Sequence, residues 1–278
     1  MPPHGSRIRF FSPGDSMRNS IRALLIGLAV IVSVASVSSH ALAYVPVADH
    51  LLVLVASRLD DPAPSVVRQV RIVTGPVAAQ VPLQYREVVY IRFPGTFRSE
   101  LTTEDGRRVL VERSGRRWTT EEAGLAEPAA EPIDLALRLL AHNRPEGLAR
   151  VLAAQGVDLT VTSLGRFEGR LGFVLGARYP DESAPQVWFD RETLLPFRWL
   201  MLRPTADGPP QRTEIRYFGW QKTGDLRYPQ VMACYQDGQL VSEVRVEKIQ
   251  SPAEIPDSLF SPVQATDQPG PAAGPEGQ

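Results

Sequence analysis

Two carboxylates, Asp190 and Glu192, are the side chains best placed to act as an acid and a base. They lie in the segment VWFDRETLLPFRWLML (187–202), which is rich in aromatic residues. A carboxylate pair beside aromatic rings suits glycoside hydrolysis when the two groups stand on opposite sides of a cleft. Here a single residue separates them, and aspartate is favoured in turns because its side chain binds nearby backbone amides. The spacing therefore favours a hairpin turn over an active site.

The other residue types that carry chemistry form no motif. His50 and His142, the histidines after residue 43, are far apart, and no H-E-x-x-H or zinc-finger pattern surrounds them. Cys234 is the only cysteine, so an intramolecular disulfide is excluded, and we expect it to be a small buried strand residue. Nucleophile-elbow, Walker and dinucleotide-binding patterns are absent from the sequence. No catalytic residue, metal site or cofactor is predicted.

Composition sets broad limits on the partners. The chain has 278 residues, of which 43% are hydrophobic and 22% charged, and its net charge is −1. These values are typical of a globular protein with no overall field that would draw it to nucleic acid or an anionic membrane. The basic residues are almost all arginine, because Lys222 and Lys248 are the only lysines.

Arginines are concentrated in one stretch, where they alternate with acidic residues. They are Arg86, Arg92, Arg98, Arg107, Arg108, Arg113, Arg116 and Arg117. The pattern predicts a solvated sheet face with ion pairs between neighbouring strands. The alternative is a positive rim that meets lipid headgroups or an acidic partner surface.

The first 43 residues have the features of a secretory signal. From Met17 the chain reads MRNSIRALLIGLAVIVSVASVSSHALA, in which two arginines precede an apolar run (23–37) and a small-residue cleavage site. The run is short for a membrane span, and an uncleaved anchor is the alternative. We predict a signal peptide over residues 1–43, with the true start at Met17 and cleavage after Ala43. The mature protein is expected to work outside the cytoplasm.

The following stretch reads as one helix and then several strands. Apolar residues from Leu51 to Leu59 recur at helical spacing. QYREVVYIRF (84–93) then alternates with a period of two, which places Glu87 on the same face as Val89, Ile91 and Phe93. Tight turns connect the strands up to about residue 120, so this group is predicted to be an antiparallel meander.

The second half of the chain completes the predicted fold. The amphipathic segments 131–143 and 145–156 predict a helical pair, after which strands resume to about residue 250. Because neighbouring strands can pair locally, we predict one α+β, mainly antiparallel β domain over residues 44–262, built as a continuous curved sheet or open barrel. Residues 263–278 are rich in proline and glycine, which predicts a disordered tail.

Three segments, taken with this order of elements, resemble a known family. They are PQVWFDRETLLPFRW (185–199), YPQVMACYQDGQLVSEVRVEKI (228–249) and IPDSLFSP (255–262). The pattern resembles the LolA/LolB-like lipoprotein-carrier superfamily, of the periplasmic outer membrane lipoprotein-sorting type, over most of the chain after residue 43. The resemblance implies an unclosed β-barrel with an apolar concave face, covered by the N-terminal helix and the helical pair as a lid.

The resemblance also implies a function. It describes a soluble periplasmic protein that shelters acyl chains of lipids or lipoproteins for transport to, or sorting at, the outer membrane. A membrane-bound donor or acceptor protein is an implied partner, whereas nucleic acid, nucleotides and cofactors are not. In such carriers an arginine on an early strand holds the lid, and Arg68 and Arg71 both occupy a similar region. The predicted cavity wall comprises Val89, Ile91, Phe93, Phe97, Leu101, Val109, Val111, Trp188, Phe197, Trp199 and Met201.

Other interpretations remain at the level of the sequence. The alternation of apolar residues fits a filled core as well as an open cavity. A second candidate function is a lipid- or lipoprotein-sensing regulatory module that binds an envelope partner protein. Its predicted contact surface is Arg107, Arg108, Arg116 and Arg117. An enzyme that uses Asp190 and Glu192 is the third and least favoured interpretation.

Overall fold

The structure is a computed structural model. It describes residues 44–59, 62–74, 82–102, 106–121, 132–203, 205 and 208–261. The predicted signal peptide, its cleavage site and the predicted tail lie outside these residues. Among the described residues, none of the helices combines the length and the apolar character that a membrane crossing requires.

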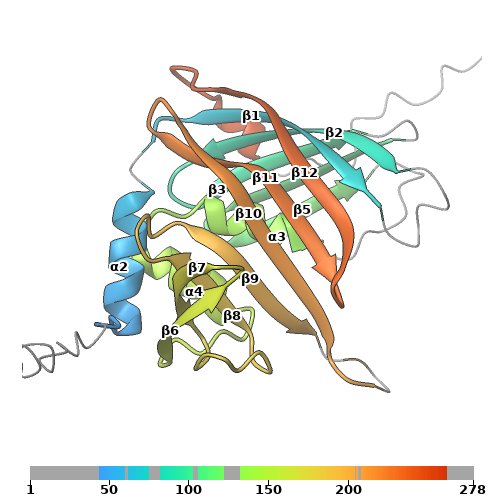
Figure 1. The fold of residues 1–278 in the computed structure, drawn as a ribbon. Coiled ribbons are helices and arrows are strands. Elements are labelled where there is room, and N and C mark those ends of the chain that lie inside the picture. The colour runs from blue at the N-terminus through green and yellow to red at the C-terminus, as the bar shows by residue number, and fades with distance from the viewer. Residues whose placement is uncertain are drawn as a thin grey trace, which may run out of the picture. The chain divides into compact units, whose positions relative to one another are not determined.

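The described strands form one twelve-stranded antiparallel sheet (Figure 1). The strand order is β5-β4-β3-β2-β1-β12-β11-β10-β9-β8-β7-β6. The pairing of β1 with β12, near the middle of the sheet, therefore joins the strands from the two halves of the chain. The strands are β1 (Ser65–Val73), β2 (Leu83–Arg92), β3 (Thr96–Thr102), β4 (Arg107–Arg113), β5 (Arg116–Glu121), β6 (Thr162–Phe167), β7 (Arg170–Leu175), β8 (Gln186–Asp190), β9 (Pro196–Arg203), β10 (Gln211–Thr223), β11 (Leu226–Gln236) and β12 (Gln239–Gln250). Within the described chain, the edge strands β5 and β6 do not pair with each other. The predicted unclosed, mainly antiparallel sheet is confirmed.

Turn chemistry explains the short connections. Ser114 and Gly115, between β4 and β5, have φ of 52° and 73°, and Asp237 and Gly238, between β11 and β12, have φ of 48° and 83°. Two successive residues at positive φ give the hairpin turn whose twist matches that of the flanking strands, and Asp-Gly is a favoured pair for it. The hairpin predicted at Asp237-Gly238 is therefore confirmed.

Three helices occur in the described residues in addition to a short 3₁₀ helix: α2 (Ala48–Arg58), α3 (Pro132–Leu140) and α4 (Pro145–Ala153). Proline at the first position of α3 and α4 suits a helix start, where its missing N–H has no partner to lose. Helix α3 contacts β10 and β11, and α4 contacts both α2 and α3. Figure 1 shows α3 inside the curve of the sheet, so the helices cover the concave face.

The concave face of the sheet is largely apolar, whereas the convex face is apolar at β3–β4 and at β7–β9 and carries charged residues such as Arg68 and Arg216 elsewhere. On the concave face, Val67, Val89, Ser99 and Leu110 stand in one row across β1 to β4 and are all buried. Val67, Val89 and Leu110 belong to a core that includes leucines of all three helices, and Ser99 lies beside it. Alternation places the next residue of each strand on the convex face.

The convex side of β3 and β4 is covered by the end of the described chain. Val109 and Val111 pack there with Ile255 and with Phe260, which belongs to the 3₁₀ helix η1 (Asp257–Phe260). The guanidinium of Arg92 lies 4.7 Å from the centre of the Phe260 ring. Ile255 and the 3₁₀ helix that follows it therefore complete a second, smaller core rather than trailing from the sheet.

We expect Phe260→Ala to destabilise the fold by about 3–5 kcal/mol, because a fully buried phenylalanine leaves a cavity when it is truncated. Chemical denaturation measures the loss. Phe218→Ala is the matched control: the Phe218 side chain is 43% exposed, so its truncation should lower the unfolding free energy by at most about 1 kcal/mol. Equal losses for the two variants would show that the second core is not formed in solution.

Candidate functional site

The candidate site is the concave face beneath α3, where a buried ion cluster joins that helix to the sheet. Asp134 of α3 accepts hydrogen bonds from both terminal nitrogens of Arg108 on β4, at 3.0 and 2.9 Å. Arg71 of β1 reaches the same carboxylate at 3.3 Å and donates to Glu87 of β2 at 2.8 Å. The four side chains are at most 3% exposed. Two arginines and two carboxylates thus balance in charge.

Neutral side chains complete the cluster around Glu87. Gln69 donates to the second carboxylate oxygen at 2.9 Å, and Ser99 donates to the first. The Tyr228 hydroxyl in turn donates to the side-chain oxygen of Gln69 at 3.3 Å. A buried carboxylate needs partners of this kind to offset its loss of hydration. The cluster therefore connects several strands and one helix.

Electrostatics keep Asp134 ionised. Burial by itself raises the pKa of this carboxyl, but the adjacent guanidiniums of Arg71 and Arg108, with a contribution from Arg117, more than offset burial. The net effect lowers the pKa of Asp134 below its ordinary value. Asp134 is therefore a carboxylate at neutral pH and holds the arginines in place.

The choice between two early-strand arginines is settled by their positions. Arg71 is completely buried and contacts α3 through Asp134, whereas Arg68 is exposed. The two residues are three positions apart on β1, so alternation places them on opposite faces. Arg71, and not Arg68, is the arginine that fastens the covering helix.

A second attachment lies at the other end of α3. Arg138 donates to Glu112 of β4 at 2.7 Å, and the protonated Nδ1 of His142 donates to the Arg138 carbonyl oxygen at 2.8 Å. A side chain at Gly95 or Gly147 would meet the His142 ring at 2.7 or 2.4 Å, so both glycines leave room for the imidazole. His142 packs this joint, and burial lowers its pKa.

The predicted cavity wall divides between the two faces of the sheet. Its concave-face members are Val89, Ile91, Phe93, Phe97, Leu101, Trp199 and Met201, which are buried except for the half-buried Phe93. Its convex-face members are Val109 and Val111, in the second core, and Trp188 and Phe197, which pack with Val174 and Ala177. The expectation that all of them line one surface is wrong.

Register explains the error in β4 and β9. Leu101 pairs with Arg108 and Ser99 with Leu110, so Arg108, Leu110 and Glu112 face the helices while the valines between them face outward. In β9 the pairing shifts beside Trp188, and Phe197 then lies against Trp188 with ring centres 6.0 Å apart. Alternation in the sequence cannot show where the pairing between two strands shifts. It also cannot show which face a residue occupies when both sides of a strand carry apolar residues.

Asp190 is the acceptor that organises a turn. One carboxylate oxygen accepts from the backbone N–H groups of Glu192 and Thr193, at 3.0 and 2.7 Å, and from the Thr193 hydroxyl at 2.9 Å. The other accepts from Arg170 at 2.6 Å. Burial raises the pKa of Asp190, but the bonds from Arg170 and Thr193 outweigh it and lower the pKa overall. Glu192 is exposed, and the predicted turn is confirmed.

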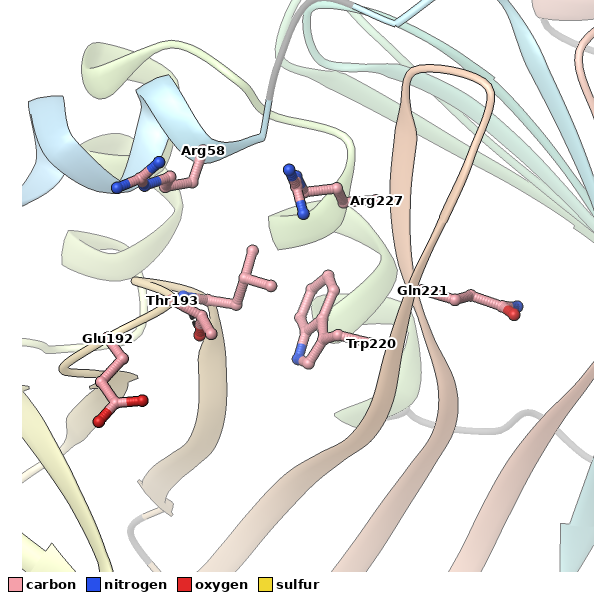
Figure 2. A pocket seen from close by; sticks show the side chains of 7 residues that line it. Arg58, Glu192, Thr193, Trp220, Gln221 and Arg227 are labelled. Atoms are coloured by element: carbon pink, nitrogen blue, oxygen red, sulfur yellow. Dashed lines mark hydrogen bonds between the residues drawn. The ribbon is translucent and has the colours of Figure 1, made fainter.

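A pocket of about 280 Å³ lies beside this turn, at one end of the concave face. Its lining comprises Arg58, Glu192, Thr193, Leu195, Trp220, Gln221 and Arg227. Figure 2 shows Arg227 and the Trp220 ring extending to the same side of their strands, whereas Gln221 points to the other side. Trp220 stacks on the buried Tyr217 with ring centres 6.2 Å apart, so this pocket adjoins the interior.

The arginine-rich stretch is not one basic surface. Arg107 pairs with Glu100 at 2.6 Å, as expected for strand-to-strand ion pairs, but Arg108 is 3% exposed and points toward α3. The partner surface predicted from Arg107, Arg108, Arg116 and Arg117 therefore cannot include Arg108. Cys234 is fully buried in β11, as predicted, and His50 is exposed.

The ion cluster was only partly visible in the sequence. Glu87 alternates with Val89 and Ile91, which is the signal of a carboxylate that faces a core. Asp134 interrupts the apolar run IDLALRLL, which is the same signal on a helix. Arg108 carries no such signal, because it is one of many arginines in a charged stretch.

Comparison with solved structures assigns the fold. A domain described as an outer membrane lipoprotein-sorting protein, from Vibrio parahaemolyticus, superposes with a TM-score of 0.50 at 10% identity, over 76% of this chain and 95% of that one. A DUF1329 family protein from Desulfovibrio piger gives 0.50 at 14% identity, over 78% and 98%. A LolA superfamily protein from Nitrosomonas europaea gives 0.43 at 12% identity, over 77% and 97%.

These similarities bear out the expected resemblance to LolA-like proteins at the level of the fold. No protein-family model matches the sequence, and no curated protein sequence matches it significantly.

We expect Asp134→Ala to lower the unfolding free energy by about 3–5 kcal/mol, because it leaves the buried guanidinium of Arg108 without its carboxylate and removes one of the two carboxylates beside Arg71. Denaturant titration measures this loss. Asp225→Ala is the matched control, since Asp225 is exposed and only approaches Lys222 at 3.8 Å; its stability should equal that of the wild type. Equal stability of all three proteins would contradict a buried ion cluster.

The difference between wild type and Asp134→Asn should depend on pH in one direction. The pKa of Asp134 is lower in the folded protein than in the unfolded chain, so its carboxylate stabilises the fold fully above the unfolded value of about 3.9. The contribution is lost as the pH falls from there through the folded pKa. Denaturation at a series of pH values should show a constant difference above about pH 5 and a shrinking one below about pH 4.

Proposed function

We propose that this protein is a periplasmic carrier that shelters the acyl chains of lipids or lipoproteins on the concave face of its sheet. The carried chain takes the place of the covering helix α3. A donor at the inner side of the envelope loads the carrier, and an acceptor at the outer membrane receives its client. The signal peptide predicted over residues 1–43 agrees with this location.

The observation that carries the proposal is the manner in which α3 is attached. Its apolar side packs on a large apolar face, but its fixed points are the ion pairs of Asp134 and Arg138. Buried ion pairs add little net stability, because the loss of hydration offsets most of the attraction, yet they define one docked position. A helix held in this way has one specific closed position.

An acyl chain supplies free energy of the same order as the apolar contacts of the helix, which buries five leucine or isoleucine side chains at about 1.5–3 kcal/mol each. Each methylene that leaves water contributes about 0.8 kcal/mol, so a chain of about 14 methylenes contributes on the order of 10 kcal/mol. The concave face offers matching apolar side chains, among them Ile91, Phe97 and Trp199. The similarity in fold to a lipoprotein-sorting domain supports the same interpretation.

The test is uptake of a fluorescent fatty acid by the purified protein. Wild type should bind it, and Asp134→Ala should bind it at least about tenfold faster, because the helix no longer has its main fixed point. Asp225→Ala should behave like the wild type. Stopped-flow fluorescence gives the rates, and native mass spectrometry of protein purified in contact with membranes should show co-purifying lipid.

Two results would refute the proposal. The first is the absence of both co-purifying lipid and fatty-acid uptake in a folded sample. The second is uptake that is identical in the wild type and Asp134→Ala, which would place the ligand away from the face that α3 covers.

A further inference from the structure

Apart from the ion pairs of β4, where an atom each of Arg108 and Glu112 is also unpaired, three buried hydrogen-bonding groups of β9 and β10 on the concave face have no partner among the described residues. They are the indole N–H of Trp199, the hydroxyl of Thr213 and the hydroxyl of Tyr217. Their residues are 0%, 1% and 1% exposed. Each such group is destabilising when it is buried without a hydrogen bond, so natural proteins carry few of them without a reason.

The three groups are neighbours on one surface. Thr213, Ile215 and Tyr217 alternate along β10, and Trp199 of β9 stands opposite Ile215. Residues two apart on a strand are about 7 Å apart, and diagonal neighbours on adjacent strands are about 7–8 Å apart. Trp199, Thr213 and Tyr217 therefore lie around the Ile215 side chain on the face that α3 contacts. Thr213 and Tyr217 are about 13 Å apart along β10, so a single carbonyl oxygen meets only one of the two hydroxyls.

The chemistry of the three groups selects the ligand. The Trp199 indole can only donate, and the two hydroxyls can each donate to an acceptor that arrives without protons of its own. Burial raises the pKa of Tyr217, so its hydroxyl stays protonated throughout the physiological range. A hydrocarbon tail leaves all three unsatisfied, and a cation meets no carboxylate among them. Carbonyl oxygens in an apolar setting satisfy them.

We infer that Trp199, Thr213 and Tyr217 form a binding site for the ester or amide carbonyl oxygens at the junction between an acyl chain and its headgroup. The inference rests on the proposed carrier function and adds the ligand class that the interior selects. The stacking of Tyr217 on Trp220 places this site next to the pocket of Figure 2, so the headgroup beyond the carbonyl extends toward Arg227. The acyl chain then runs along the apolar side chains that α3 covers in the free protein.

The experiment compares two probes of similar length, methyl dodecanoate and tetradecane, which differ in having or lacking an ester. Competition against a bound fluorescent fatty acid gives both affinities. In Tyr217→Phe or in Thr213→Val, according to which hydroxyl meets the single carbonyl of the probe, the ratio of ester affinity to alkane affinity should fall about five- to tenfold, because one hydrogen bond to the carbonyl is lost. The melting temperature of the ligand-free variants should stay equal or rise, since a buried unpaired hydroxyl has been removed.

Tyr228→Phe is the matched control. Tyr228 is equally buried, but its hydroxyl already donates to Gln69. Its removal should lower the melting temperature and change both affinities together, which leaves their ratio at the wild-type value.

The remaining outcomes separate the carbonyl site from the carrier function. If neither probe binds to the wild type, the carrier function fails. If both bind but Tyr217→Phe and Thr213→Val keep the wild-type ratio, the carrier function stands and the carbonyl site is wrong. If these two variants are destabilised as Tyr228→Phe is, their hydroxyls already have partners in the free protein, and the site is also wrong.

Discussion

The structure depends on the contact between Asp134 and the two arginines, Arg71 and Arg108, that face it from different strands. These three groups come from α3, β1 and β4, so the contact sets both the position of the helix and the spacing of the sheet beneath it. Charges at this depth are tolerated only while they compensate one another. The helix therefore has one closed position, and the side chains that it covers are buried by an element that is fixed at points rather than along its whole length.

Much of the fold follows from local sequence signals. The period-two segments, the Asp237-Gly238 turn and the prolines that begin α3 and α4 each predict what is observed. The assignment of faces does not follow where both sides of a strand carry apolar residues, as in β4 and β9. The segment RVLVER alternates equally well with Val109 and Val111 inside or outside, and only the pairing of β4 with β3 decides between them. Coverage of the convex face by Phe260, far along the chain, is a tertiary fact of the same kind.

The candidate site was predicted least well, for a related reason. Arg108 lies in a charged stretch that is typical of a surface. It is buried because α3, which follows it in the chain, places the carboxylate of Asp134 beside it. Trp199 was correctly placed on the concave face, but as an apolar contact; its unpaired N–H is visible only when every neighbour is known. Thr213 and Tyr217 look like ordinary strand residues. Long-range pairing, rather than residue type, makes all of these groups functional candidates.

The order of the strands gives the helices a further role. β5 and β6 are the two edges of the sheet, and α3 and α4 lie between them in the chain. The helices that cover the concave face thus also belong to the covalent connection between the two edge strands of the sheet. A change in the position of α3 and a change in the distance between the two sheet edges are therefore coupled through the chain itself.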